Sequence, residues 1–109
     1  MNLKTEKFSE GVTIEVQEPR VDMSSAKNFK LEMEEILKEQ PELVILNLTD
    51  VEYFDSSALG TLVNLSRSVK SYGGEIRLCS LSQSLRTLLK LSKLELMFKI
   101  FDNVEAAKG

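Results

Sequence analysis

Hydrophobic residues recur along this chain with two different periods, and each period predicts a type of secondary structure. Val12, Ile14 and Val16 alternate with polar residues, which is the pattern of a strand with one covered face. Residues 3–8 show a weaker alternation and are predicted to form the hairpin partner of that strand. The run from Leu43 to Leu48 is apolar at nearly every position, which predicts a central strand covered on both faces.

Three later segments carry apolar residues at helical spacing. The first predicted helix is capped by Asp22 or Ser24 and ends before Pro41, and its buried face consists of Ala26, Phe29, Met33, Ile36 and Leu37. The second follows Asp55 and stops at Gly73-Gly74. Its expected buried face consists of Leu59, Leu62, Val63, Ser66, Val69 and Tyr72, and its outer face of Thr61, Arg67, Lys70 and Ser71. The third buries Leu85, Leu88 and Leu89.

Two further strands complete the predicted fold. Residues 76–80 and the shorter segment 98–101 have strand character. Strands that alternate with helices in this way indicate an α/β fold. The chain of 109 residues is long enough for one core, so we expect a single domain over residues 1–109. Its mixed central β-sheet is predicted to have four to five strands, with about four α-helices.

The composition of the chain excludes several classes of function but does not by itself indicate one. The formal net charge of -3 argues against binding nucleic acid through clustered Lys and Arg. Arg86, Lys90, Lys93 and Lys99 make the C-terminal third more cationic, but such spacing is typical of a solvated helix face. The chain has no histidine, which excludes serine–histidine and cysteine–histidine catalysis, and we expect its single Cys79 to be buried and inert.

No targeting signal or long apolar segment is present in the sequence. The N-terminal residues lack the apolar stretch of a signal peptide, and no run of eighteen apolar residues indicates a membrane span. The expected location is therefore the cytoplasm. No glycine-rich phosphate loop accompanies Gly73-Gly74, so no cofactor is predicted, while direct binding of a nucleotide is left open by the sequence.

The segment Asp55-Ser56-Ser57 is the strongest candidate for a functional site, because it places hydroxyl groups at the start of the second helix. The first N–H groups of a helix lack intrahelical partners and lie at the positive end of its dipole, so a phosphate is stabilised there. The alternative is that Asp55 caps the helix and the serines only fill its first turn. Asp22, Asp50 and Asp55 could similarly form a cation site, although caps and turns explain these residues more simply.

The order of these elements resembles a known family. An apolar strand followed by Asn47-Leu48-Thr49-Asp50-Val51, and then by Asp55-Ser56-Ser57-Ala58-Leu59-Gly60, is similar to the signature of the STAS domain. More narrowly, the chain resembles bacterial anti-sigma factor antagonists, over nearly its whole length. It departs from the family at three positions where glycine is frequent, which are Pro19, Ala58 and Lys93.

The resemblance implies a regulatory role without enzymatic activity. In the family, the serine directly after the aspartate is phosphorylated by an anti-sigma factor that is also a serine protein kinase, and this position matches Ser56. The resemblance implies that the unphosphorylated protein binds this kinase and releases the sigma factor, and that a serine phosphatase resets the switch. The partner-binding surface would then comprise Asp22, Ser24, Asp55, Ser56 and Ser57.

Two other classes of function remain open on the sequence. A STAS-like fold could serve as a phosphorylation-independent scaffold or as an accessory subunit of a signalling or lipid-transport complex. An enzyme that hydrolyses nucleotides is the third class, but the sequence offers neither a phosphate loop nor a general base for it.

Overall fold

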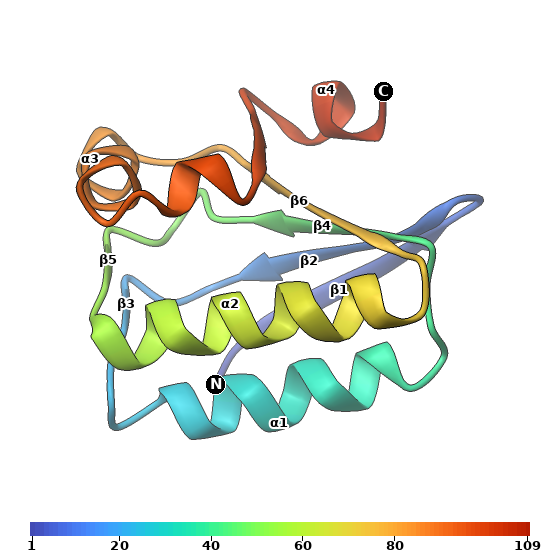
Figure 1. The fold of residues 1–109 in the computed structure, drawn as a ribbon, viewed down its shortest axis with the longest axis horizontal. Coiled ribbons are helices and arrows are strands. Elements are labelled where there is room, and N and C mark those ends of the chain that lie inside the picture. Colours follow the sequence, from blue (N-terminus) through green and yellow to red (C-terminus); the bar gives the residue numbers. More distant parts are fainter.

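A five-stranded mixed sheet forms the centre of the molecule (Figure 1). A computed structural model describes all 109 residues. The strands lie in the order β1-β2-β4-β6-β7, with bounds β1 (Leu3–Phe8), β2 (Gly11–Val16), β4 (Leu43–Asn47), β6 (Glu75–Cys79) and β7 (Lys99–Phe101). β1 pairs with β2 in an antiparallel hairpin, and the other three pairings are parallel. The predicted α/β class, hairpin and strand number are thus confirmed.

Four α-helices surround this sheet, three of them on its two faces and one at its end (Figure 1). α1 (Ala26–Leu37) and α2 (Ser56–Ser71) lie side by side on one face. α4 (Val104–Lys108) covers the other face over β4 and β6, and α3 (Gln83–Leu91) lies at the end of the molecule where the central strands finish. A 3-10 turn, η1 (Leu94–Leu96), connects α3 to β7. No helix is both long enough and apolar enough to cross a membrane.

The strand β4 is buried on both faces, as its apolar sequence predicts. Val44 and Leu46 belong to the main core, which β4 shares with α1 and α2. Leu43 and Ile45 point to the opposite face and pack against Cys79 and Ala107. Because residues alternate between the faces of a strand, one continuous apolar run supplies both cores.

A second, two-stranded sheet was not predicted from the sequence. β3 (Arg20–Val21) and β5 (Tyr53–Phe54) pair in parallel just before α1 and α2. Each has only two residues, too few to show a periodic pattern. The N–H groups of Glu52 and Tyr53 both donate to the carbonyl of Pro19, at 2.8 and 3.3 Å. This small sheet fixes the starts of the two helices next to each other.

Several local predictions are corrected by the structure. The N-cap of α1 is Ser25, not Asp22 or Ser24, and its hydroxyl makes no capping bond. On α2, Thr61 is buried although it was assigned to the outer face, because its hydroxyl can donate to the carbonyl of Ser57 at 3.1 Å. Ala58 and Leu65 also belong to the buried face, whereas Leu59, Val63 and Tyr72 are only half-buried.

Two glycines are required where the structure places them. A Cβ atom on Gly11 would lie 1.8 Å from the carbonyl oxygen of Leu43, so only glycine permits β2 to approach β4 at this point. Gly73 has φ +87°, which allows the chain to leave α2 and turn back into β6, and this confirms the predicted stop signal.

Candidate functional site

Asp55 is the N-cap of α2 and also connects the starts of the two long helices. One carboxylate oxygen, Oδ1, accepts the N–H of Ala58 at 3.0 Å, the usual capping bond. The other, Oδ2, accepts the N–H of Met23 at 2.9 Å, from the turn before α1. The N–H of Asp55 itself donates to the carbonyl of Val21 at 3.1 Å. Both carboxylate oxygens are therefore engaged by the backbone.

Ser56 and Ser57 occupy the first turn of α2 and are exposed. Neither hydroxyl hydrogen-bonds to another group of the protein, and the N–H groups of both residues precede the first intrahelical bond. No hydrogen bond joins the Asp55 carboxylate, which accepts two backbone N–H groups, to the adjacent Ser56 hydroxyl. The Ser56 hydroxyl is thus exposed and has no base hydrogen-bonded to it.

Asp22 organises the turn that precedes α1. Its Oδ1 accepts both the N–H of Ser24, at 3.0 Å, and the Ser24 hydroxyl, at 2.6 Å. The Ser24 hydroxyl holds the pKa of Asp22 below its usual value, with smaller contributions from the Ser24 N–H and the charge of Arg20. The predicted site residues Asp22 and Ser24 are therefore one local unit, and the bond from Met23 connects this unit to Asp55.

Sequence reasoning missed three residues of this surface, namely Arg20, Met23 and Tyr53. Met23 has its backbone fixed by Asp55, yet its side chain is 79% exposed. The guanidinium of Arg20 lies over the ring of Tyr53, 4.8 Å from the ring centroid. The sequence offers one signal for Met23. It is an apolar residue between two polar ones, Asp22 and Ser24, in the turn before the first helix, where no periodic pattern buries it.

The motif is held from below by buried aromatic and aliphatic residues. Phe54, directly before Asp55, has no exposed surface and packs against Phe29 of α1, with 6.3 Å between the ring centroids. Ala58, one turn into α2, is likewise fully buried. The hydroxyl of Ser82 donates to the carbonyl of Val51 at 3.3 Å. The site is thus an exposed polar turn on a rigid apolar base.

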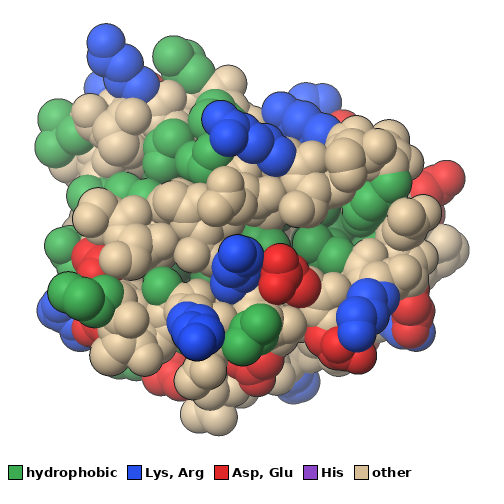
Figure 2. Space-filling model, turned by 60° about the horizontal axis from the view of Figure 1, so that its bottom comes forward, with side chains coloured by type: hydrophobic (Ala, Val, Ile, Leu, Met, Phe, Trp, Pro, Cys, Tyr) green, Lys and Arg blue, Asp and Glu red, His purple; other side chains and the backbone are tan.

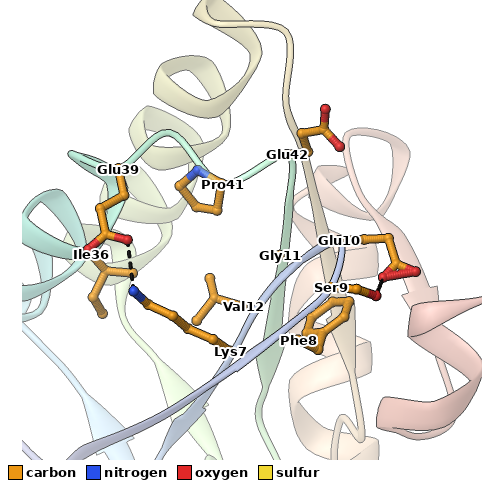
Figure 3. A pocket seen from close by; sticks show the side chains of 10 residues that line it. All are labelled: Lys7, Phe8, Ser9, Glu10, Gly11, Val12, Ile36, Glu39, Pro41 and Glu42. Atoms are coloured by element: carbon orange, nitrogen blue, oxygen red, sulfur yellow. Dashed lines mark hydrogen bonds and ion pairs between the residues drawn. The ribbon is translucent and has the colours of Figure 1, made fainter.

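The surface around Ser56 contains neither a cluster of metal-binding carboxylates nor the pocket that Figure 3 shows. Asp22, Asp50 and Asp55 do not meet in a metal-binding cluster. Figure 3 shows a pocket of about 260 Å³ at the other end of the strands, between the β1–β2 hairpin and the end of α1. There, Lys7 and Glu39 form an ion pair of 2.9 Å. The turn around Ser56 is therefore an exposed surface outside this pocket.

The fold and this surface together define a class of protein, an α/β domain in which an exposed serine begins the helix that follows the central strand. The chain belongs to the STAS domain family, whose model matches residues 2–107. It is 32% identical over 102 residues to a candidate anti-sigma factor antagonist of Thermotoga neapolitana, a match that covers 93% of this chain and 90% of that protein.

Two further comparisons agree with the family assignment. The anti-sigma F factor antagonist of Paenibacillus polymyxa is 30% identical over 105 residues, covering 94% of this chain and 90% of that protein. The crystal structure of a candidate anti-sigma factor antagonist from Thermotoga maritima superposes with a TM-score of 0.85 at 27% identity. That superposition covers 97% of this chain and 91% of the other. The resemblance seen in the sequence is thus confirmed.

Proposed function

We propose that this protein is an anti-sigma factor antagonist whose activity is switched by phosphorylation of Ser56. In its unphosphorylated form it binds an anti-sigma factor that is also a serine kinase, and the sigma factor is released. Phosphorylation of Ser56 cancels this binding, and a separate serine phosphatase restores it. The protein acts in the cytoplasm as a single regulatory domain and catalyses no reaction itself.

The observation that carries this proposal is the exposed, unpartnered hydroxyl of Ser56 beside an aspartate with both oxygens engaged. A kinase can reach such a hydroxyl without unfolding the helix. No side chain of the protein is hydrogen-bonded to this hydroxyl as a base, so we assign the phosphoryl chemistry to the partner. The names of two relatives, both called anti-sigma factor antagonists, support the proposal that this protein has that function.

The surface around Ser56 explains how a phosphate would prevent binding. The carboxylates of Asp22 and Asp55 lie on the same surface, joined through the backbone of Met23, and the apolar Met23 side chain projects from the same turn. A partner that docks on Ser56 would bury a new charge of about -1.5 to -2 beside these groups. Such burial costs several kcal/mol, and about 4 kcal/mol corresponds to roughly a thousandfold loss of affinity.

The first test is phosphosite mapping by mass spectrometry after wild type, Ser56→Ala and Ser57→Ala are incubated with ATP and host lysate. We expect one phosphate on wild type and on Ser57→Ala, located at Ser56, and none on Ser56→Ala. Modification of Ser57 in place of Ser56 would refute the assignment of the site. Absence of modification under all growth conditions would favour a phosphorylation-independent STAS scaffold or accessory subunit.

The second test measures binding to the cognate anti-sigma factor. Ser56→Asp should bind at least about a hundredfold more weakly than wild type, whereas Ser56→Ala should bind nearly as tightly. Ser68→Asp, an exposed position later on the same helix, is the matched control and should have little effect. Equal binding by Ser56→Asp and wild type would contradict the switch.

A further inference from the structure

Charge is distributed very unequally along this chain. Residues 1–66 contain six Lys or Arg and thirteen Asp or Glu, a net charge of -7. Residues 67–101 contain seven Lys or Arg and only two Glu, a net charge of +5. Figure 2 shows most of the visible acidic side chains in its lower half, where basic side chains are interspersed with them, and mainly basic and hydrophobic side chains in its upper half. The first part of the chain is therefore strongly acidic and the second strongly basic, although the net charge of the whole chain is only -3.

The basic part also carries the two most exposed leucines of the protein. Leu91, at the end of α3, is 78% exposed, and Leu96, at the end of η1, is 82% exposed. Below them, Leu88, Leu94 and Met97 are only partly buried against the core. Exposed aliphatic side chains that project from the surface are suited to insertion into a soft apolar medium.

Lys90 and Lys93 lie on either side of Leu91 in the sequence, and Arg67 precedes Lys70 by one turn on α2; none of these four cations has a partner within the protein. All four are exposed, and none forms a salt bridge. Lys70 and Leu96 line the same hollow, beside the start of β6. By contrast, Arg86 lies 3.5 Å from Asp102 and Lys99 lies 3.6 Å from Glu75, so their charges are partly neutralised.

We propose that this basic and apolar surface, formed by Arg67, Lys70, Lys90, Leu91, Lys93 and Leu96, adsorbs to an anionic lipid bilayer. Unpaired cations attract the lipid headgroups, and the projecting leucines enter the boundary between headgroups and acyl chains. An acidic protein would also be attracted by these cations. However, a protein partner covers leucines best when they line a groove, whereas Leu91 and Leu96 project from the surface. The acidic half is repelled by the bilayer, which fixes the orientation of the adsorbed molecule.

The test is sedimentation with vesicles of phosphatidylcholine alone, or of equal parts phosphatidylcholine and phosphatidylglycerol, at low ionic strength. Wild type should bind the anionic vesicles at least about tenfold more strongly than the neutral ones, because each cation near such a surface strengthens adsorption roughly fivefold. Lys70→Gln/Lys90→Gln should therefore weaken binding by about tenfold or more. Lys93 is left unchanged because its backbone has φ +63°.

The leucines are tested by the pair Leu91→Ser/Leu96→Ser, which should also lower binding by at least about tenfold. The controls are Leu31→Ser, a leucine on α1 that is 53% exposed, and Lys27→Gln/Lys30→Gln, two unpaired lysines of the same helix. These should change binding less than about twofold. Circular dichroism melts of every variant verify that the fold is retained.

Three results would overturn the proposal. The first is that wild type fails to sediment with the anionic vesicles. The second is that the α1 controls lose as much binding as the variants at the basic surface. The third is binding to immobilised polyglutamate but not to vesicles, with loss in Leu91→Ser/Leu96→Ser, which would assign the surface to an acidic protein. The proposal does not depend on phosphorylation of Ser56, so it can fail or succeed independently of the proposed function.

Discussion

Replacing Asp55 by alanine should destabilise the protein by about 2 kcal/mol, even though the residue lies on a surface turn. The substitution removes the cap on Ala58, which is typically worth about 0.5 to 2 kcal/mol. It also removes the bond to the N–H of Met23, which is solvent-accessible and contributes roughly 0.5 to 1 kcal/mol. For 109 residues, an unfolding entropy of about 2.1 cal/mol/K per residue converts the loss to about 9 °C in Tm.

The conservative variant Asp55→Asn separates these two bonds. Asparagine is as good an N-cap as aspartate, so the bond to Ala58 should survive. Its second polar atom is an NH₂ group, which cannot accept the N–H of Met23. We therefore expect Asp55→Asn to lose about half as much stability as Asp55→Ala.

Guanidinium denaturation followed by circular dichroism gives both values, provided that the slope of free energy against denaturant is unchanged. The control is Asp50→Ala, an exposed aspartate of the same loop whose side chain makes no hydrogen bond or salt bridge in the protein. It should shift stability by less than about 0.5 kcal/mol. The reasoning is refuted if Asp55→Ala and Asp50→Ala are equally stable.

Three further predictions concern residues away from the site. Ser66→Ala should stabilise the protein by about 1 kcal/mol more than Ser68→Ala, because the buried Ser66 hydroxyl has no hydrogen-bond partner. Ser68 is an exposed serine of the same helix, so it controls for helix propensity, and denaturant melts measure the difference. Lys93→Gly should raise stability by up to about 1 kcal/mol in the same assay, since φ +63° is costly for a residue with a side chain, and a lower Tm would contradict this. Burial raises the pKa of the Cys79 thiol, so a thiol reagent at pH 8 should react far faster with denatured than with native protein, and equal rates would disprove the burial. Because the thiolate is disfavoured in the fold, the free energy of unfolding should also fall as pH rises above about 9.

The main elements could be predicted from the sequence because their patterns are long. The apolar run of β4 and the stripe of Phe29, Met33 and Leu37 on α1 each bury what the pattern indicates. The capping role of Asp55 also follows from its position before an apolar helix, and the structure confirms it. Local side-chain chemistry was sufficient in these cases.

The rest depends on contacts between segments distant in the sequence. β3 and β5 are recognisable only as partners, since Val21 and Phe54 pair across 33 positions of the chain. The same pairing brings Met23 to Asp55, so a role for Met23 could not be read from its neighbours. Thr61 was placed on the wrong face because its hydroxyl is satisfied by the backbone of its own helix, which makes burial inexpensive.

Under the proposed function, the exposure of Ser56 predicts that phosphorylation acts on binding and not on folding. In the free protein, the start of α2 stabilises a phosphate by roughly 0.3 to 1 kcal/mol, and water screens its repulsion from Asp55 and Asp22 to a similar size. These opposing effects nearly cancel because Ser56 is exposed. In a docked complex the water is removed, the repulsion is no longer screened, and Met23 offers the phosphate no hydrogen bond. The proposed switch therefore requires a dianion that is almost neutral for the fold and strongly unfavourable for the proposed interface, and the position of Ser56 meets the first of these conditions.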